Sequence, residues 1–470
     1  MTVTIPTIPT LSPTAAALCA QDAFRSGRTT AMQWRRDQLT ALDRLLVENG
    51  AAFETALKSD LGRHPLETHI VELGSVRAEI ALVLKKLDAW TKPRKVSLPL
   101  SLRPAKASIV RQPLGTVLII SPWNYPIHLL LMPLIGAIAA GNAVVVKPSE
   151  LAPETSHLMA RLFAAYLDPD AIRVVEGAVD ETTELLEFPW DHIFYTGNGA
   201  VAKIIMAAAA KHLTPVTLEL GGKSPVWVDE SADIEAAAGW IAWGKFLNAG
   251  QTCVAPDYVL ATPAVVESLI EALGRRVADM YGTDPHASSD FGRIVNARHV
   301  DRLVALSGSG TVAFGGGFDR EERFLAPTVL RDVSIDDAVM GEEIFGPILP
   351  IITVAGLDEA ITIINGREKP LALYCFTGRA DVRTAFIERT TSGGLAINST
   401  MLQVGVSTLP FGGVGASGMG AYHGELSLRV FSHERSVARK LRGPNLVRLG
   451  WPPYTDKKER MLRGRGSGSN

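Results

Sequence analysis

Cysteine is scarce in this chain, whose 470 residues include only Cys19, Cys253 and Cys375. An odd number of widely separated cysteines forms neither a disulfide framework nor a Cys-x-x-Cys metal motif. We therefore expect no disulfide bonds and no metal centre. Free thiols fit a reducing compartment, so the expected location is the cytoplasm.

An excess of charge of either sign is also missing. Lysine and arginine total 47 against 49 aspartate and glutamate residues, which gives a formal net charge of −2. Without a basic excess there is little to displace counterions from a phosphate backbone, so a nucleic-acid-binding function has no support from composition. Small molecules and other proteins are the expected partners.

No segment has the pattern of a signal peptide or a membrane anchor. The N-terminal "MTVTIPTIPT" lacks a basic region followed by an apolar core. Residues 112–146 contain no Asp, Glu, Lys or Arg, and such a stretch is long enough to cross a bilayer of about 30 Å. Pro133, Gly136 and the Gly141-Asn142 pair interrupt it, however, and favour a buried helix followed by a buried strand. Residues 441–470 are predicted to form a solvated tail, because "DKKERMLRGRGSGSN" is polar and mostly basic.

Apolar residues are plentiful, at 47% of the chain against 20% charged residues. This usage is typical of a globular protein with a large core and two or three domains. Apolar residues at helical spacing from Gln33 to Trp90 predict a helical N-terminal segment. Prolines and short β-type runs predict a strand-rich excursion over residues 92–111.

Short apolar strands alternate with helices from residue 116 onward. The strands are "TVLII", "AVVV", "IRVV", "HIFYT" and "PVTLEL", and the intervening helices are predicted near residues 127–140, 153–166 and 200–211. Such a pattern indicates a doubly wound α/β fold, whose parallel sheet binds ligands beyond the carboxyl ends of its strands. The pattern begins again after Gly222, which predicts a second α/β domain holding Cys253.

Polar side chains follow two of these strands directly. Asn124 lies in the rigid turn "SPWNYP", where its amide could donate to an oxyanion or simply bond its own backbone. Lys147 and Glu150 follow "AVVV" in "KPSE". They could bind the ribose hydroxyls or phosphates of a nucleotide, or form a surface ion pair near a helix start.

A glycine motif follows "HIFYT", since "GNGAVA" from Gly197 to Ala202 satisfies G-x-G-x-x-G/A at a helix start. A lone motif of this kind is a weak signal. The acidic residue that the dinucleotide fingerprint expects about 20 positions later would be Glu219, which lies beside two glycines in "LELGGKSP".

Cys253 stands in "WGKFLNAGQTCVAPDYV", and a free cysteine is often just a small buried hydrophobic residue. Together with the carboxylate of Glu219 and the amide of Asn124, however, this thiol supplies the parts for covalent oxidation of a carbonyl compound. The thiolate would attack, the amide would hold the oxyanion, and the carboxylate would activate water.

The combination of motifs resembles the aldehyde dehydrogenase superfamily along nearly the whole chain. The resemblance rests on "PWNYP", "KPSE", "LELGGKSP", "GQTC", "EEIFGP" and "PFGGVGASGMGAYHG", in this order. The glycine-rich last motif, the short N-terminus and "WPPYTDKK" look most like the class 3 branch, which includes fatty, benzaldehyde and coniferyl-type enzymes.

The resemblance implies an architecture with three units. A Rossmann-like cofactor domain would comprise residues 1–91 and 112–219, and a catalytic domain residues 220–400. A small strand-built bridging unit, which joins subunits, would comprise residues 92–111 and 401–440. A homodimer is expected.

The resemblance also implies residue roles. It makes Cys253 the nucleophile, Glu219 the general base and Asn124 the oxyanion donor in NAD(P)-dependent oxidation of an aldehyde to a carboxylic acid. The cofactor-binding residues would be Lys147, Glu150, Gly197, Glu343 and Phe345, and the substrate pocket would draw on Tyr125, Trp243, Leu247, Met401 and Phe411.

The implied pocket is apolar and partly aromatic, which favours an aromatic or a medium- or long-chain aliphatic aldehyde. Glu150 favours NAD over NADP, because a carboxylate repels a ribose 2′-phosphate. One departure from the family pattern is Ala202, which stands where a glycine is usual. Its methyl group is predicted to crowd the cofactor pyrophosphate.

Three other functions remain open on sequence grounds. An acylating dehydrogenase would pass the acyl group to coenzyme A, although Glu219 argues for water as the acceptor. A non-catalytic protein could share the fold, although the Cys, Glu and Asn set is intact. A cysteine hydrolase would need a histidine that the sequence does not place near Cys253.

Overall fold

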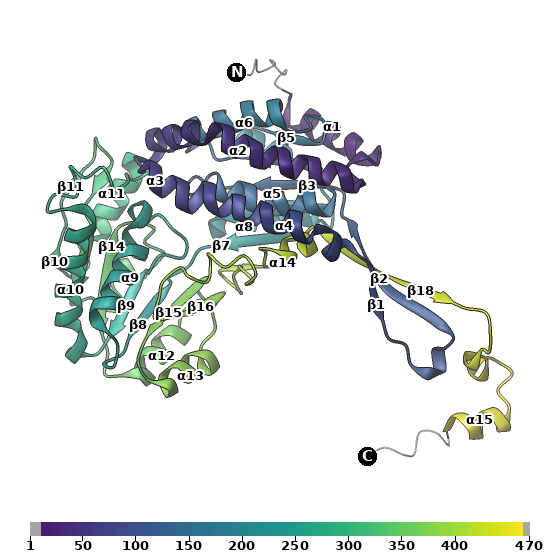
Figure 1. The fold of residues 1–470 in the computed structure, drawn as a ribbon. Coiled ribbons are helices and arrows are strands. Elements are labelled where there is room, and N and C mark those ends of the chain that lie inside the picture. The colour runs from purple at the N-terminus through teal and green to yellow at the C-terminus, as the bar shows by residue number, and fades with distance from the viewer. Residues whose placement is uncertain (1–10, 464–470) are drawn as a thin grey trace.

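The computed structural model describes residues 11–463. The N-terminal decapeptide, in which no signal sequence is expected, and the last seven residues of the predicted tail lie outside the described residues. The described chain forms a helix-covered first sheet, a second sheet beside it, and an arm that projects away from both (Figure 1).

Long helices at the N-terminus cover the first sheet, as the helical spacing predicts. Their apolar faces are buried, and α2 packs against α5 and α6 while α4 packs against α5. The bounds are α1 (Pro13–Arg25), α2 (Met32–Leu61), α3 (Pro65–Thr68), α4 (Ser75–Thr91), α5 (His128–Ala140) and α6 (Pro153–Tyr166).

The first sheet has six strands in the order β17-β7-β6-β3-β4-β5, all parallel except β17 at the edge. Helices cover both of its faces, which explains why the strands read as continuous apolar runs. The predicted doubly wound arrangement is thus confirmed. The bounds are β3 (Thr116–Ile120), β4 (Ala143–Lys147), β5 (Ile172–Val174), α7 (Val179–Leu186), β6 (His192–Gly197), α8 (Gly199–Ala210), β7 (Val216–Leu220) and β17 (Gly418–Met419).

The charge-free stretch of residues 112–146 is interior, because it forms β3, α5 and β4, with every residue of α5 after His128 buried. Over residues 11–463, none of the helices combines the length and apolar character needed to cross a membrane.

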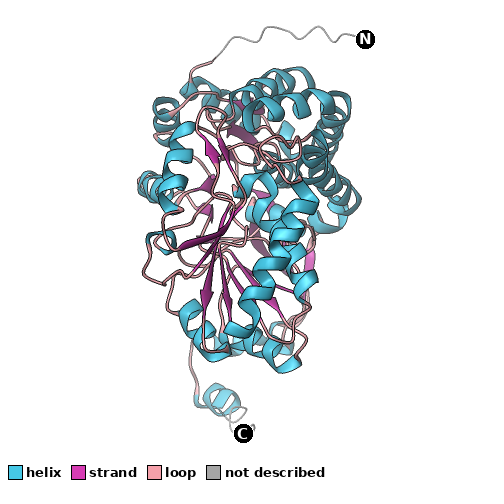
Figure 2. Cartoon of the chain, turned by 90° about the vertical axis from the view of Figure 1, so that its left-hand side faces the viewer, coloured by secondary structure: helices cyan, strands magenta, loops and turns pink. Residues whose placement is uncertain are grey.

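The second sheet has seven strands in the order β10-β13-β14-β9-β8-β15-β16, and all but β10 are parallel. Figure 2 shows helices around these strands. The bounds are β8 (Pro225–Val228), α9 (Ile234–Phe246), β9 (Tyr258–Ala261), α10 (Pro263–Tyr281), α11 (Ala297–Leu306), β10 (Thr311–Phe314), β11 (Phe318–Asp319), β12 (Phe324–Leu325), β13 (Thr328–Arg331), β14 (Ile348–Thr353), α12 (Leu357–Asn365), β15 (Ala372–Phe376), α13 (Ala380–Arg389) and β16 (Gly394–Ile397).

The arm is an antiparallel sheet of β1 (Arg94–Val96), β2 (Ala105–Pro113) and β18 (Ser432–Lys440). The strand-rich excursion predicted over residues 92–111 therefore pairs with a strand more than 300 residues later. Between β16 and the arm, β17 joins the first sheet and α14 (Glu425–Val430) packs on α5. The tail forms the exposed helix α15 (Asp456–Arg463).

Candidate active site

The turn that carries Asn124 meets the loop that carries Cys253. The turn follows β3 and the loop follows α9, so they come from different sheets. The Asn124 Nδ2 donates to the backbone oxygen of Gln251 at 3.0 Å, and the Asn248 Nδ2 donates to the backbone oxygen of Asn124 at 2.9 Å. The side chain of Asn124 thus contacts a residue 127 positions later in the sequence, in the loop just before Cys253.

The loop before Cys253 has an unusual backbone. Asn248, Ala249 and Gly250 all have positive φ, at 52°, 52° and 75°. Gly250 must be glycine, because a Cβ there would lie 2.3 Å from the backbone oxygen of Gly346. Left-handed non-glycine residues are strained and persist only where their surroundings hold them. The loop therefore stores strain next to the sulfur.

The surroundings of Cys253 do not favour its thiolate. The residue is a free, half-buried cysteine. Burial raises the pKa of its thiol, and the charges of Glu343 and Glu219 raise that pKa further. The backbone N–H groups of Cys253 and Val254 act in the opposite direction without offsetting this rise. The positive charge that a thiolate needs is thus not supplied by the described residues around it.

Glu219 lies in β7 and is 2% exposed. Neither of its carboxylate oxygens has a hydrogen-bond partner among the described residues. Burial raises the pKa of this carboxyl well above its ordinary value. A buried carboxyl without partners is costly for the fold and is expected where a substrate or water completes the site.

Two of the predicted cofactor residues form a pair at the end of β4. Lys147 is 3% exposed, and its Nζ donates to the backbone oxygen of Pro148 at 2.9 Å and to the Glu150 Oε2 at 3.4 Å. Burial lowers the pKa of Lys147, and the Glu150 charge opposes this shift. Because Glu150 is exposed, the pair presents a carboxylate to solvent at a strand end.

The glycine motif lies where β6 ends and α8 begins. Gly197 closes β6, and a Cβ added to Gly199 in the first turn of α8 would meet no atom within 4 Å. The N-terminus of this 12-residue helix is suited to a phosphate, and the Asn198 Oδ1 accepts from one of its N–H groups, that of Val201, at 2.9 Å. Ala202 is 1% exposed and belongs to the apolar core. This position does not support the predicted crowding.

Glu343 lies against Gly221, whereas Phe345 lies against Trp123. A Cβ at Gly221 would overlap the Glu343 carboxylate, so the first glycine of "LELGGKSP" makes room for it. Burial raises the pKa of Glu343 to about 8, against the lowering effects of the Gly222 N–H, Lys223 and Lys245. Phe345 has φ 49° and packs edge-on against Trp123, with ring centroids 5.4 Å apart. The Lys147 ammonium at the end of β4, the backbone N–H groups at the start of α8 and the Glu343 carboxylate are of the kinds that bind the phosphates and hydroxyls of a dinucleotide.

The predicted pocket residues have different surroundings. The Tyr125 hydroxyl lies 2.7 Å from the Thr252 Oγ1, next to Cys253. Leu247 begins the strained loop and is 7% exposed. Trp243 and Met401 are half-buried, and the Phe411 ring is stacked on His423 with centroids 5.3 Å apart.

Several buried polar residues around the site are not predicted from the sequence. The Lys245 Nζ and the Tyr422 hydroxyl are buried without partners among the described residues. Burial lowers the pKa of Lys245 to about 8. Burial raises the pKa of Tyr422 well above its ordinary value, and the charges of Glu219 and Cys253 raise it further. Lys245 could have been noticed in the sequence, because it is a lysine inside the apolar run "IAWGKF". No comparable sequence signal marks Tyr422. Arg63, Glu67 and Glu72 are likewise absent from the predicted site.

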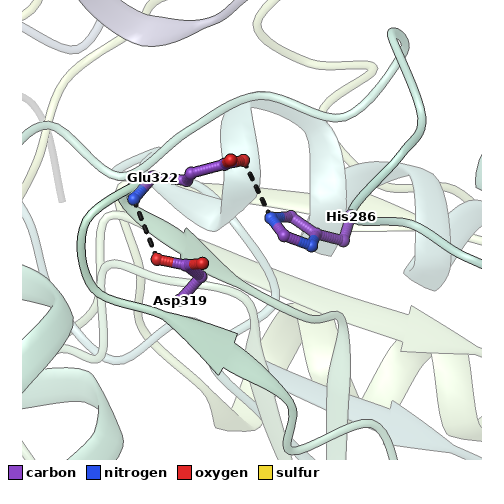
Figure 3. Close-up of side chains that lie close together, drawn as sticks. All are labelled: His286, Asp319 and Glu322. Carbon is purple, nitrogen blue, oxygen red and sulfur yellow. Dashed lines mark hydrogen bonds and ion pairs between the residues drawn. The ribbon is translucent and has the colours of Figure 1, made fainter.

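A group of three side chains outside this site has the composition of a metal site (Figure 3). Among residues 11–463, the group consists of His286, Asp319 and Glu322. The His286 Nε2 already lies 2.9 Å from the Glu322 Oε2, and Asp319 accepts from the backbone N–H of Glu322 at 3.0 Å. Arg293 adds a positive charge nearby. These groups satisfy one another, so nothing in this arrangement calls for an ion.

Comparison with known proteins agrees with this geometry. A model of the aldehyde dehydrogenase family matches residues 4–437. The mouse protein called "Aldehyde dehydrogenase, dimeric NADP-preferring" is 48% identical over 442 residues, covering 94% of this chain and 98% of that protein. Rat aldehyde dehydrogenase family 3 member B1 is 48% identical over 445 residues, covering 94% of this chain and 95% of that protein.

Solved structures give the same result. A structure of the substrate-bound state of Staphylococcus aureus AldH superposes with a TM-score of 0.93 at 43% identity, covering 97% of this chain and 99% of that one. An indole-3-acetaldehyde dehydrogenase in complex with NAD⁺ superposes with a TM-score of 0.83 at 25% identity, covering 91% of this chain and 89% of that one. Matched in sequence and in fold over nearly its full length, the chain belongs to the aldehyde dehydrogenase family, whose members are oxidoreductases that use NAD or NADP and whose class 3 branch supplies these mouse and rat relatives.

Proposed function

We propose that this enzyme oxidises an aldehyde to the carboxylic acid through a covalent thioester on Cys253, with Glu219 as the base that activates water. The observation that carries the proposal is the contact between the Asn124 amide and the Cys253 loop, beside a buried carboxyl that has no partner among the described residues. The Asn124 amide, the Cys253 thiol and the Glu219 carboxyl would thus serve as oxyanion donor, nucleophile and base.

Before the first step the Cys253 thiol loses its proton to solvent; the thiolate sulfur then bonds to the aldehyde carbon, and the carbonyl oxygen becomes an oxyanion. The Asn124 Nδ2 uses one N–H for Gln251 and has a second N–H to donate to that oxyanion. Bound NAD or NADP supplies the acceptor for the hydride that leaves the same carbon, which becomes a thioester carbonyl. Lys147, Glu150, Gly197, Glu343 and Phe345 would hold this cofactor.

The second step releases the acid. Glu219 takes a proton from water, the resulting hydroxide adds to the thioester carbon, and the carbon–sulfur bond breaks to return the thiolate. A carboxylate with an ordinary pKa is a weak base at neutral pH. Because burial raises the pKa of Glu219, its ionised form is a stronger base than an exposed carboxylate.

The proposed substrate is an aromatic or a medium- or long-chain aliphatic aldehyde, since the residues assigned to the pocket are apolar or aromatic. Both cofactors are candidates: Glu150 favours NAD, whereas the mouse relative is named NADP-preferring. We also infer a homodimer joined through the arm, in line with the word "dimeric" in that name, and a cytoplasmic location, in line with three free cysteines.

The test is an assay of aliphatic and aromatic aldehydes with NAD and with NADP, on the native enzyme and on Cys253→Ala. We expect turnover with apolar aldehydes in the native enzyme and none in the variant. Cys19→Ala is the matched control, because Cys19 is also free and half-buried but lies in α1. Turnover retained by Cys253→Ala would refute the mechanism. Coenzyme A added to the assay should not change the product, which separates this function from an acylating one.

A further inference from the structure

Arg63 is a fully buried cation, placed between α2 and α3 with 0% of its side chain exposed. Its Nη2 donates to the backbone oxygen of Asn124, its Nη1 donates to Glu72, and its Nε lies 3.3 Å from the Glu67 Oε1. The guanidinium carbon lies 4.7 Å from the centre of the Tyr125 ring. Two of its nitrogens therefore donate hydrogen bonds, and the third lies within ion-pair distance of the Glu67 carboxylate.

The carboxylates of Glu72 and Glu67 connect Arg63 to two segments of the active site, the turn that carries Asn124 and the loop that carries Cys253. The Glu72 Oε2 accepts from the backbone N–H groups of Ile127 and His128, at 2.8 and 3.0 Å, where the Asn124 turn enters α5. The Glu67 Oε1 accepts from the backbone N–H of Asn248 at 3.1 Å, in the strained loop before Cys253. We call Arg63, Glu67 and Glu72 the clamp.

The clamp therefore binds the backbone of the turn on one side and of the loop on the other. The same Asn124 oxygen that accepts from Arg63 also accepts from Asn248, so the two segments share a hydrogen-bonded centre. Asn248 has φ 52°, a conformation that needs support from its surroundings. Removing the clamp would release the residue that carries the amide and the loop that carries the sulfur.

We propose that Arg63 is a positioning residue for catalysis, which fixes the Asn124 amide relative to Cys253 so that it meets the developing oxyanion. This inference rests on the proposed function. Lysine could keep the charge but not the planar set of donors that reaches Glu72, Glu67 and Asn124 at once. Catalytic groups displaced by about 1 Å can lose about 100-fold in rate.

The experiment is a double-mutant cycle on the single-turnover rate of hydride transfer, measured as reduced cofactor formed with an apolar aldehyde. Arg63→Lys should slow this step about 10- to 100-fold, with little change in KM for the aldehyde. In an Asn124→Ala background the same substitution should change the rate by no more than about 2-fold, because the donor that it positions is gone.

Arg35→Lys is the matched control. Arg35 is also buried, and it donates to the backbone oxygens of Ala139 and Thr30, away from both active-site segments. A loss of stability alone would slow the reaction by the same factor in both backgrounds, as we expect for this control. Equal factors for Arg63→Lys in the two backgrounds would overturn the inference and leave the proposed function standing.

Two further outcomes are decisive. If Arg63→Lys does not fold, Glu67→Gln in the same cycle replaces it, since Arg63 and Glu72 then stay paired while the Asn248 contact loses its charge. Coupling to Asn124 supports the inference and additivity overturns it. If Asn124→Ala alone leaves hydride transfer unchanged, the oxyanion role is wrong, and the proposed function falls together with the inference.

Discussion

Two buried carboxylates near the active site have opposite surroundings. Glu72 is 0% exposed, and its oxygens bind Arg63 and two backbone N–H groups. Glu219 is 2% exposed, and neither oxygen has a partner among the described residues. Burial raises the pKa of both, but only for Glu72 do hydrogen bonds and a cation oppose the rise. A satisfied buried charge supports the fold, whereas an unsatisfied one is kept for a reaction.

The asparagines show the same contrast. Asn142 is fully buried; its Oδ1 accepts from the Gly115 N–H at 2.9 Å, and its Nδ2 donates to the backbone oxygens of Ala137 and Phe431 at 3.1 and 2.9 Å. Asn124 is 2% exposed, yet its Oδ1 has no partner among the described residues and its Nδ2 makes one bond. The Asn124 amide therefore keeps hydrogen-bonding capacity for a substrate, whereas the Asn142 amide does not.

The largest expected effect is on the open carboxylate. Glu219→Gln removes the base and should lower steady-state turnover by about 10²- to 10⁴-fold, the usual contribution of a general base. Hydride transfer should continue, so a burst of about one reduced cofactor per active site should precede slow turnover. Stopped-flow absorbance measures both phases. An unchanged steady-state rate would remove Glu219 from the mechanism, and loss of the burst would place it before deacylation.

For Glu72, whose carboxylate has hydrogen-bond partners, the expected effect of substitution is on stability. Glu72→Gln removes the carboxylate that hydrogen-bonds to Arg63 and leaves Glu67 as the remaining partner of this buried charge, and breaking a buried ion pair costs about 3 to 5 kcal/mol in the free energy of unfolding. Glu219→Gln should leave that free energy unchanged or raise it, because the carboxyl that it replaces has no partner among the described residues. Denaturant unfolding of both variants with the native enzyme measures the difference. Equal losses of stability would break the contrast between the two carboxylates.

The residues with open hydrogen-bonding capacity, and the cofactor residues near them, are largely predictable from the sequence. Asn124, Lys147 and the Gly197 motif come where short apolar strands end, and parallel strands end at one edge of a sheet, so periodicity and strand ends located them. The motifs "LELGGKSP" and "GQTC" indicate Glu219 and Cys253. The order of strands, and the pairing of β2 with β18 more than 300 residues away, could not be read from local patterns.

The buried charged residues that pair with one another were not predictable from the sequence. Arg63, Glu67 and Glu72 stand in a helical segment whose charged residues normally face solvent, and only the tertiary contacts with residues 124–128 and 248 bury them. The surroundings of Ala202 were not predictable for a related reason. Its position near the start of a helix follows from the sequence, but its place in the apolar core depends on packing. The crowding of the cofactor by its methyl group stays a prediction.

The smallest expected effect tests the predicted crowding of the cofactor by Ala202. Ala202→Gly removes a methyl group from the core rather than from the helix opening, so the Kd for NAD should stay within about 2-fold, while glycine in a helix costs about 1 kcal/mol of stability. Gly199→Ala is the matched variant, because its new methyl group would enter the open space at the start of α8 and should weaken NAD binding. Fluorescence titration measures both affinities. Tighter binding by Ala202→Gly would restore the crowding hypothesis, since relief at the pyrophosphate would then outweigh the loss of a buried methyl group.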